Sequence, residues 1–322
     1  MRIAFIGLGN MGGPMSRNLA SAGLDVTVYD ANPAQAQVPA AKGATVAASA
    51  AEAVAGVDLL ITMLPTPAVV EDVMLGGGGV LAALPDGALW VDMSTSVPAV
   101  ADRVRARGAA KGLRVLDAPV SGMQKGADAG TLQVFVGGEV ADFEQALPVL
   151  HVLGDPERVL HVGGHGAGYA VKLCINLLWF VQLVGIAEVL ALGTEAGVDL
   201  ATLQRSLVAS PANSVLLERD FEGLLTAGDY DEGFAIALAC KDLGLAVDLA
   251  REVRLPVEVS AVVEQVFRRA RAQYGDRAGE MTPVKLYEDI TGHPLRLTRP
   301  AVPAPSRPAD DADPATTEGL PA

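Results

Sequence analysis

The glycine pattern that follows the first apolar run constrains the fold more than any other feature. Residues 2–6 read RIAFI, a strand pattern, and Gly7, Gly9 and Gly12 follow in the spacing GxGxxG before a helical stretch at 11–22. In a strand–turn–helix unit the first glycine permits the tight turn, the second lets the backbone approach a pyrophosphate, and the third allows close helix–strand packing. Backbone amides at the helix start then face the anion. The pattern predicts a dinucleotide-binding turn made of Gly7, Leu8, Gly9, Asn10, Met11 and Gly12.

The acidic residue that such a turn requires lies at the end of the second expected strand. Asp30 closes the run VTVYD, 18 residues after Gly12. A carboxylate at this position accepts hydrogen bonds from the adenosine ribose. It also repels the 2′-phosphate of NADP, and the following Ala31-Asn32 offers no arginine to bind that phosphate. We therefore expect NAD in preference to NADP, with Asp30 and Asn32 at the adenosine end of the cofactor.

The first half of the chain alternates strand and helix patterns, which is typical of βαβ units and a mostly parallel sheet. Short β-rich runs predict strands at 2–6, 25–30, 59–64, 89–94, 114–120, 132–137 and 158–162. Helices are expected at 11–22, 49–55, 67–74 and 97–110, and a glycine-rich polar loop joins the strands at 114–120 and 132–137. The predicted class is an α/β Rossmann domain with a doubly wound sheet.

The pattern changes from strands to helices near residues 163–168. Long helical patterns follow at about 166–196, 199–208 and 233–252. Gly193 and Gly197 predict the end of the first of these helices, and Asp199 the N-cap of the next. We therefore expect a Rossmann domain over 1–163, an all-α domain over 164–296 and a tail over 297–322. The tail is rich in proline and alanine, has little to bury and is predicted to be disordered.

Composition narrows the classes of function. The 322-residue chain has 24 lysines and arginines against 38 aspartates and glutamates, a formal net charge of −14, which argues against a nucleic-acid partner. The four histidines and two cysteines give no zinc-binding spacing, so we expect no metal. Cys174 and Cys240 lie in apolar helical patterns, which predicts buried, reduced thiols in a cytoplasmic protein. The N-terminus shows no signal-peptide pattern.

One apolar segment imitates a membrane span. Residues 173–192 read LCINLLWFVQLVGIAEVLAL, which is long enough to cross a bilayer. Asn176, Gln182 and Glu188 interrupt the run, and Lys172 precedes it. A helix buried between domains or subunits has the same pattern. We favour burial and expect no membrane partner.

Lys172 stands near the head of this segment, after the glycines at 163–168. Asn176 follows four residues later, so the two polar side chains share one helix face. One interpretation is a lysine whose ammonium reaches water from a helix end. The other is a general acid/base, because an amine in a partly desolvated crevice has a lowered pKa. A bound NAD cation would lower that pKa further.

Four separated motifs resemble those of the β-hydroxyacid dehydrogenases, which include 3-hydroxyisobutyrate dehydrogenase and tartronate semialdehyde reductase. The motifs are FIGLGNMG, DAPVSG with AGTLQVFVGG, GxGxxxKxxxN at 166–176 and KDLGLA at 241–246, within a resemblance that covers residues 1–296. It implies a 6-phosphogluconate-dehydrogenase-like fold in which a long helix joins a Rossmann domain to an all-α domain, in dimers or tetramers. It also implies NAD(P)-dependent interconversion of a small 3-hydroxy acid and its semialdehyde or 3-oxo acid.

The resemblance assigns roles to individual residues. Lys172 matches the family's catalytic lysine, and Asn176 its neighbour at the substrate. Ser121 and Gly122 match the anchor for the substrate carboxylate, while Phe234 either lines the pocket or packs in the core. The positions that match cofactor contacts are Met63, Leu64, Pro65, Thr95 and Lys241.

The substrate loop departs from the family pattern. Many members read SGG, whereas this chain has Ser121-Gly122-Met123. Methionine adds bulk and removes backbone freedom, so Met123 joins the expected substrate contacts and puts the usual small substrates in doubt. Lys125 either reaches a second anionic group or is solvated. Two other functions stay open, namely imine reduction on the same fold and nucleotide binding without catalysis.

Overall fold

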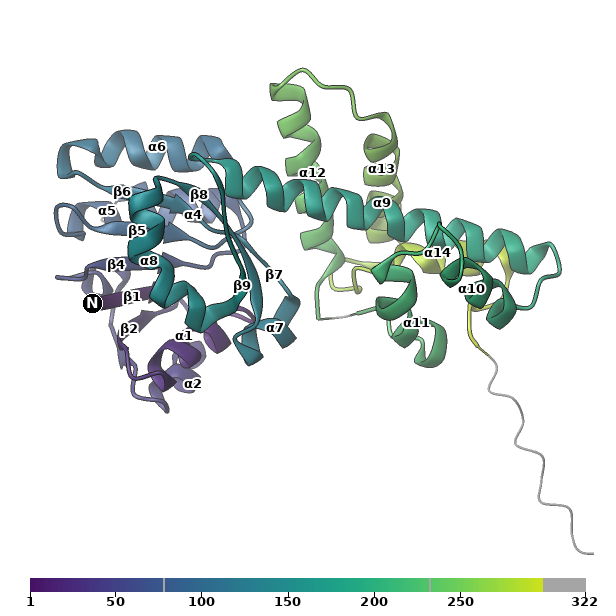
Figure 1. Cartoon of the computed structure of the whole chain (residues 1–322), viewed down its shortest axis with the longest axis horizontal. Coiled ribbons are helices and arrows are strands. Elements are labelled where there is room, and N and C mark those ends of the chain that lie inside the picture. Colours follow the sequence, from purple (N-terminus) through teal and green to yellow (C-terminus); the bar gives the residue numbers. More distant parts are fainter. Residues whose placement is uncertain (78, 232, 298–322) are drawn as a thin grey trace, which may run out of the picture.

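The structure, a computed structural model, describes residues 1–77, 79–231 and 233–297, arranged as a sheet domain and a helical domain (Figure 1). This arrangement confirms the predicted fold class. The predicted tail begins at residue 297, and all of it beyond Leu297 lies outside the described residues. The backbone N–H of Leu297 donates to the Leu225 carbonyl at 2.8 Å, so this residue belongs to the folded helical domain.

Within the described residues, the first domain contains one sheet of nine strands. Its order is β3-β2-β1-β4-β5-β6-β8-β7, with β9 paired to β8. The first six strands are parallel, β8 runs antiparallel to β6 and to β7, and β9 is parallel to β8. The strands are β1 (Arg2–Ile6), β2 (Asp25–Tyr29), β3 (Thr45–Val46), β4 (Leu59–Thr62), β5 (Leu89–Asp92), β6 (Arg114–Asp117), β7 (Val120–Ser121), β8 (Leu132–Gly138) and β9 (Gly154–Gly163).

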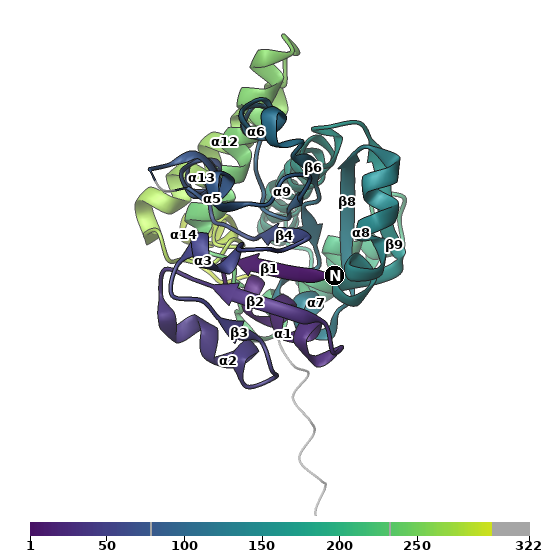
Figure 2. The ribbon, with the colours of Figure 1, turned by 90° about the vertical axis from the view of Figure 1, so that its left-hand side faces the viewer.

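Helices cover both faces of this sheet (Figure 2). All residues of β4 and β5 are buried, which is why their sequences read as continuous apolar runs rather than alternating ones. One hydrophobic core joins the sheet to α1 and α8, and the other joins it to α4 and α6. The helical segments of this domain are α1 (Gly12–Ser21), η1 (Pro33–Ala36), α2 (Gln37–Ala40), α3 (Ala50–Ala53), α4 (Pro67–Leu75), α5 (Val80–Ala83), α6 (Pro98–Gly108), η2 (Ala109–Lys111), α7 (Met123–Ala129) and α8 (Val140–Leu153).

Two expectations for the middle of this domain are wrong. The single strand expected at 114–120 is divided into β6 and β7, because Pro119 has no N–H with which to continue a ladder. The polar loop expected after it contains the helix α7, which ends at Gly130 with φ +67°. The sequence patterns also did not predict β3 or the 14-residue helix α8.

The second domain consists of helices. They are α9 (Ala167–Glu195), α10 (Leu200–Val208), η3 (Leu216–Asp220), α11 (Glu222–Ala227), α12 (Ile236–Glu252), α13 (Glu258–Tyr274) and α14 (Pro283–Thr291). The predicted N-cap is confirmed, since the Asp199 carboxylate accepts the Thr202 N–H at 2.9 Å. Gly193 does not end α9. It lies inside the helix, where a Cβ would come within 2.3 Å of Leu203 on α10.

Helix α9 carries the apolar segment and joins the two domains (Figure 1). Its length and composition would suffice to cross a membrane, and 33% of its most apolar window is buried within the chain. Phe180, Leu183 and Leu190 pack into the helical core, whereas Leu178 and Leu192 are exposed. One face of this helix is therefore buried within the chain, and burial of its other face against a second subunit stays a prediction.

Candidate active site between the two domains

The glycine turn after β1 has the geometry that a dinucleotide requires. Gly7 has φ +95°, and an added Cβ would come within 2.3 Å of the Met63 carbonyl oxygen. At Gly12 an added Cβ would lie 1.9 Å from the Gly7 carbonyl oxygen. Around Gly9 there is open space, with no atom within 4 Å of its Cβ position. Gly7 and Gly12 therefore close the turn, and Gly9 leaves room for a pyrophosphate.

The groups around this turn also fit a dinucleotide. Helix α1 starts at Gly12 without a side-chain cap or an acidic first turn, which leaves its N-terminus open to an anion. In its first turn the Gly13 N–H already donates to the Gly9 carbonyl at 3.0 Å. The partly exposed Asp30 accepts the N–H of Leu8 and the N–H of Asn32, both at 2.7 Å. This carboxylate therefore shapes the glycine turn directly, and each of its oxygens can still accept a further hydrogen bond from a ribose hydroxyl.

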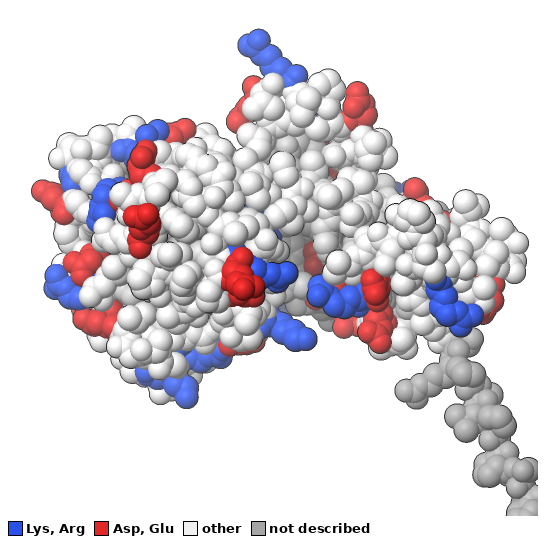
Figure 3. Space-filling model, in the orientation of Figure 1, with Lys and Arg blue, Asp and Glu red and all other residues white. Residues whose placement is uncertain are grey.

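The turns after β4 and β5 lie side by side at the carboxyl ends of these parallel strands. The Leu64 N–H donates to Ser94 Oγ at 2.9 Å. Lys241, on α12 of the helical domain, donates to the Pro65 carbonyl at 2.9 Å and to the Thr95 carbonyl at 3.5 Å. The cofactor positions expected after β4 and β5 thus meet Lys241 of the helical domain. The molecular surface is hollowed between the two domains (Figure 3).

Lys172 lies on the second turn of α9, partly buried. Its predicted partner Asn176 donates through Nδ2 to Asp242 Oδ2 at 2.7 Å. Asp242 is 2% exposed, and its Oδ1 lies 3.0 Å from the Lys241 ammonium. A polar chain thus runs from the cofactor turns through Lys241 and Asp242 to the lysine's helix neighbour.

Burial and nearby charges act in opposite directions on Lys172. Burial lowers the pKa of its ammonium, and the charge of Lys241 adds to this effect. The carboxylates of Asp242 and Glu280 raise the pKa but do not overcome burial. Glu280 is itself buried, and burial together with Asp231 raises its pKa to about 8. Lys172 therefore has a partner carboxyl whose charge depends on pH near neutrality.

The glycines before Lys172 let the helix start against the sheet. Gly166 has φ +87°, and its N–H donates to Asp117 Oδ1 at 2.7 Å. A Cβ on Gly168 would lie 2.4 Å from the carbonyl oxygens of both Asp117 and Phe135. Only glycine allows this approach, so the GxGxxxK pattern places the lysine a fixed distance from the strand ends.

The chain matches two family models in sequence order. Residues 2–164 match the NAD-binding domain of 6-phosphogluconate dehydrogenase. Residues 166–287 match the model described as NAD-binding of NADP-dependent 3-hydroxyisobutyrate dehydrogenase. The chain belongs to the β-hydroxyacid dehydrogenase family. It is an NAD(P)-dependent hydroxyacid dehydrogenase.

Individual relatives of this dehydrogenase match it over nearly their whole length. The 2-(hydroxymethyl)glutarate dehydrogenase of Eubacterium barkeri is 39% identical over 292 residues, 91% of this chain and 96% of that enzyme. The 3-hydroxyisobutyrate dehydrogenase of Pseudomonas aeruginosa is 40% identical over 271 residues, 82% of this chain and 90% of that enzyme. The solved 3-hydroxyisobutyrate dehydrogenase of Mycobacterium tuberculosis with L-serine has a TM-score of 0.81 at 35% identity, covering 89% of this chain and 99% of that one.

Imine reductases are more distant from the dehydrogenase. The imine reductase of Myxococcus stipitatus has a TM-score of 0.60 at 21% identity, covering 89% of this chain and 98% of that chain. At this identity the likeness shows a shared fold alone. The imine-reductase alternative therefore has no support beyond the fold.

The expected substrate loop of the dehydrogenase contains two consecutive residues with positive φ, Gly122 and Met123. Ser121 ends β7, and Gly122 follows with φ +129°. Met123 has φ +55° and is 46% exposed, and it is the first residue of α7. Phe234 is partly buried against the helical core. Its carbonyl accepts the Glu280 N–H at 2.9 Å, so it lies beside the buried carboxyl near Lys172.

One expectation about the cysteines is wrong. Cys240 is buried as predicted, but Cys174 is exposed. It lies on α9 two residues after Lys172, and a helix that is apolar on all sides does not show from its sequence which face is covered.

Five residues of the dehydrogenase that shape the site carried no prediction: Asp92, Asp117, Tyr169, Asp242 and Glu280. Asp117 and Asp242 lie within the matched motifs DAPVSG and KDLGLA, which was a usable signal. The others have no local pattern, because their partners are distant in sequence. Within the described residues, no three His, Cys, Asp or Glu side chains gather as a metal-binding group.

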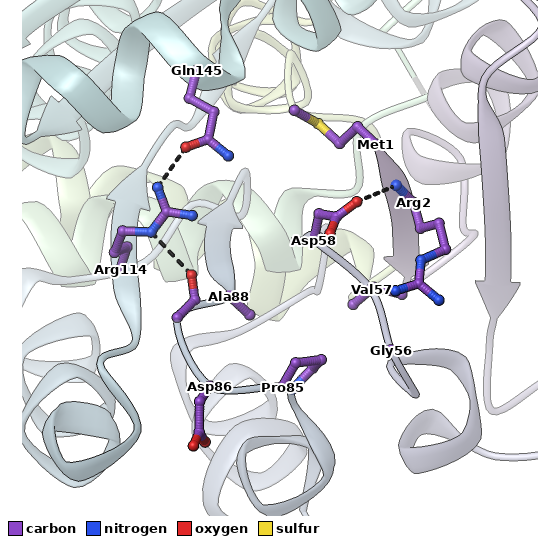
Figure 4. A pocket seen from close by; sticks show the side chains of 11 residues that line it. Met1, Arg2, Gly56, Val57, Asp58, Pro85, Asp86, Ala88, Arg114 and Gln145 are labelled. Carbon is purple, nitrogen blue, oxygen red and sulfur yellow. Dashed lines mark hydrogen bonds between the residues drawn. The ribbon is translucent and has the colours of Figure 1, made fainter.

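A separate cavity of about 350 Å³ lies at the opposite end of the strands (Figure 4). Met1, Arg2, Asp58 and Arg114 line it, and polar groups there bond to one another: the Arg2 N–H donates to Asp58 at 2.8 Å, and Arg114 donates to Gln145 at 2.5 Å. Open α/β sheets bind ligands at the carboxyl ends of their strands. This cavity at the amino ends is therefore not part of the candidate active site.

Proposed function

We propose that Lys172 is the general acid/base for reversible oxidation of a small 3-hydroxy acid by NAD. The observation that carries this proposal is the setting of the Lys172 ammonium. Burial lowers its pKa, and Asp242 holds the neighbouring Asn176 in place. A lysine with a lowered pKa can be neutral when substrate binds, so it can take a proton and later return it.

The proposed step moves one proton and one hydride. The neutral Lys172 amine takes the proton of the substrate hydroxyl, and the O–H electron pair forms the carbonyl. The hydride leaves the carbon that carried the hydroxyl. NAD, when bound, supplies the hydride acceptor. In the reverse direction the Lys172 ammonium returns its proton to the carbonyl oxygen, while Asn176 orients the substrate or the lysine.

The substrate carboxylate is proposed to bind at Ser121 and Gly122, through the serine hydroxyl and backbone N–H groups. Met123 and Phe234 would then contact the rest of the substrate. The relatives named for 2-(hydroxymethyl)glutarate and 3-hydroxyisobutyrate support this substrate class, because both compounds carry a hydroxyl on the carbon β to a carboxylate. Lys125 is exposed on α7 and is available to a second anionic group.

NAD is proposed as the cofactor in preference to NADP. The support is Asp30, whose carboxylate lies beside the glycine turn and bonds to Leu8 and Asn32. A 2′-phosphate next to this carboxylate would meet like charge. NADH should therefore bind more tightly than NADPH in a fluorescence titration, and Asp30→Ala should narrow that difference.

A second copy of the chain is proposed to cover the exposed apolar side of α9, giving a homodimer or homotetramer in the cytoplasm. Leu178 is 59% exposed and Leu192 is 71% exposed, as is Ile290 on α14 at 70%. Exposed apolar side chains of this size on a long helix favour association in water. Light scattering after size exclusion should give twice or four times the 33.1 kDa chain mass, and a monomer would contradict the proposal.

The decisive assay is a substrate panel. The purified chain is mixed with 3-hydroxyisobutyrate, 2-(hydroxymethyl)glutarate, 3-hydroxypropionate, glycerate or L-serine, each with NAD and with NADP, and absorbance of the reduced cofactor is followed. We expect reduction of NAD with at least one of these acids. No reduction with any acid and either cofactor would contradict the proposed function.

A further inference from the structure

Asp92, at the end of β5, is a buried carboxylate that bonds to both sides of the candidate active site. Asp92 is completely buried, at 0% exposed. Oδ1 accepts the Thr62 hydroxyl at 2.7 Å, the Ser94 hydroxyl at 2.6 Å and the Ser94 N–H at 3.2 Å. Oδ2 accepts the Tyr169 hydroxyl at 2.6 Å. The two oxygens of one carboxylate thus serve two different parts of the molecule.

The Oδ1 side leads to the cofactor turns. Ser94 gives its hydroxyl proton to Asp92 and accepts the Leu64 N–H at 2.9 Å. Ser94 is also the neighbour of Thr95 in the turn after β5. The Ser94 hydroxyl, which Asp92 orients, therefore joins the turn after β4 to the turn after β5, and Lys241 joins the same two turns from the helical domain.

The Oδ2 side leads to Lys172. Tyr169 lies three residues before Lys172 in α9, and its ring is completely buried. Its N–H donates to Asp117 Oδ2 at 3.1 Å, so both its backbone and its hydroxyl are fixed to the sheet domain. Because a helix rises about 1.5 Å per residue, Lys172 is about 4.5 Å farther along the same rigid turn.

Stability alone does not account for this arrangement. A buried carboxylate needs several hydrogen bonds to offset its desolvation, and apolar side chains of similar volume often stabilise a protein as well or better. A fully bonded polar network, in contrast, permits one geometry. The benefit that remains is control of position.

We propose that Asp92 is a positioning residue that fixes Lys172 relative to the cofactor turns. This proposal rests on the proposed function, because it assigns the lysine and the turns to one reaction. Hydride and proton transfer need the reacting groups aligned, and a misplacement of about 1 Å can slow turnover as much as 10²-fold. Neither Ser94 nor Tyr169 needs to touch the substrate.

The test is a double-mutant cycle on turnover. Ser94→Ala and Tyr169→Phe each remove one hydroxyl from Asp92, and turnover is measured with NAD and hydroxy acid both saturating. We expect each single variant to lose about tenfold in kcat. The double variant should lose only about 10- to 20-fold, because the alignment is already lost after the first change. Independent losses, with a double variant near 100-fold, or single losses below twofold would overturn the proposal.

A matched control separates position from general structure. Tyr274 OH donates to Asp289 at 2.6 Å, a tyrosine–aspartate bond of the same length that lies away from the site and is exposed. Tyr274→Phe should keep normal kcat. Tyr169→Phe should keep the wild-type affinity for NAD while losing kcat, and its kcat should be compared well below its melting temperature. A matching loss in Tyr274→Phe would indicate a general structural effect and overturn the proposal.

A measurement that needs no turnover distinguishes failure of this proposal from failure of the proposed function. Reductive methylation of Lys172, quantified by mass spectrometry with and without NAD, reports whether the cofactor lies over the lysine. NAD should protect Lys172 in the wild-type chain and much less in Tyr169→Phe at equal NAD occupancy. Equal protection in both chains would overturn the role of Asp92, whereas inactivity of the wild-type chain on the substrate panel would overturn the proposed function instead.

Discussion

The buried carboxyl groups of the sheet domain and those beside Lys172 are compensated in different ways. Asp117 accepts two N–H groups from the start of α9, at 2.7 and 3.1 Å, and Asp92 is equally well bonded. Glu280 is also buried, at 6% exposed against 0% for the two aspartates, yet its carboxyl bonds to no side chain among the described residues, and its pKa is raised to about 8. Burial also raises the pKa of Asp92 and of Asp117, but their hydrogen bonds act against it. These bonds fix geometry, whereas the charge of Glu280 depends on pH near neutrality.

The largest effect should come from removing a fully bonded carboxylate. Asp117→Ala leaves the N–H groups of Gly166 and Tyr169 buried without partners. Each such group costs about 1–3 kcal/mol, so the free energy of unfolding should fall by about 2–6 kcal/mol in a denaturant titration. Asp117→Asn keeps one acceptor oxygen and should lose less. A change below about 0.5 kcal/mol in Asp117→Ala would break the comparison.

Asp242 shares features with both kinds of carboxyl group. It accepts a hydrogen bond from Asn176, as the carboxylates that fix geometry do, and its charge lies next to the Lys241 ammonium. Asp242→Asn weakens the hold on Asn176 and removes a charge that raises the pKa of Lys172. We expect kcat/KM to fall on the order of tenfold. The rise of oxidation rate with pH should shift to lower pH, because the lysine loses its proton more easily. An unchanged pH profile would show that Asp242 does not act on the lysine.

Removing the charge of Glu280 should raise the stability of the fold, whereas removing Asp117 should lower it. Its pKa rises from 4.5 to about 8 on folding, so between these pH values the folded chain holds a proton that the unfolded chain releases. Stability from this group is therefore lost as pH rises through that window. Glu280→Gln carries no charge and should gain several degrees in Tm over wild type at pH 8, and little at pH 4.5.

A matched variant sharpens this result. Glu288 is also buried in the helical domain, but it accepts bonds from Leu295 at 2.9 Å and Arg296 at 2.8 Å. Glu288→Gln should lower Tm at both pH values. Equal responses of the two glutamine variants would remove the distinction between bonded and unbonded carboxyl groups.

Met123→Gly should have the smallest effect on stability and act mainly on substrate choice. Methionine at φ +55° is strained, and glycine relieves that strain but loses more entropy on folding. The two contributions oppose each other, so the free energy of unfolding should change by less than about 1 kcal/mol. The ratio of kcat/KM values between 2-(hydroxymethyl)glutarate and 3-hydroxypropionate should change severalfold. A constant ratio would show that Met123 does not contact the substrate.

The sequence could predict features that depend on residues near one another in the chain, but not the bonds that join distant residues. The glycine turn, Asp30 and the N-cap Asp199 are local features, in which residues near in sequence determine the backbone. The Asp92–Tyr169 bond joins residues 77 positions apart, and Asn176 and Asp242 are 66 apart. Neither pairing follows from spacing or periodicity, because each depends on how α9 packs against the strand ends.

Helix α9 shows the same limit in its packing. The apolar composition of residues 173–192 correctly predicted a long helix, but nearly every face of it is apolar. The sequence therefore did not distinguish the buried Phe180 from the exposed Cys174 and Leu192. In α13, by contrast, the spacing of Val263, Phe267 and Ala270 follows the helical period and was a usable signal that the sequence interpretation missed.

The central claim, that Lys172 is the acid/base of an NAD-dependent hydroxyacid dehydrogenase, is tested most directly by Lys172→Ala. With the best acid from the panel, kcat should fall by about 10²–10⁴, the usual contribution of general acid–base catalysis. The affinity for NADH should stay within about twofold of wild type, because Lys172 lies outside the glycine turn. Near-normal turnover in this variant would contradict the account.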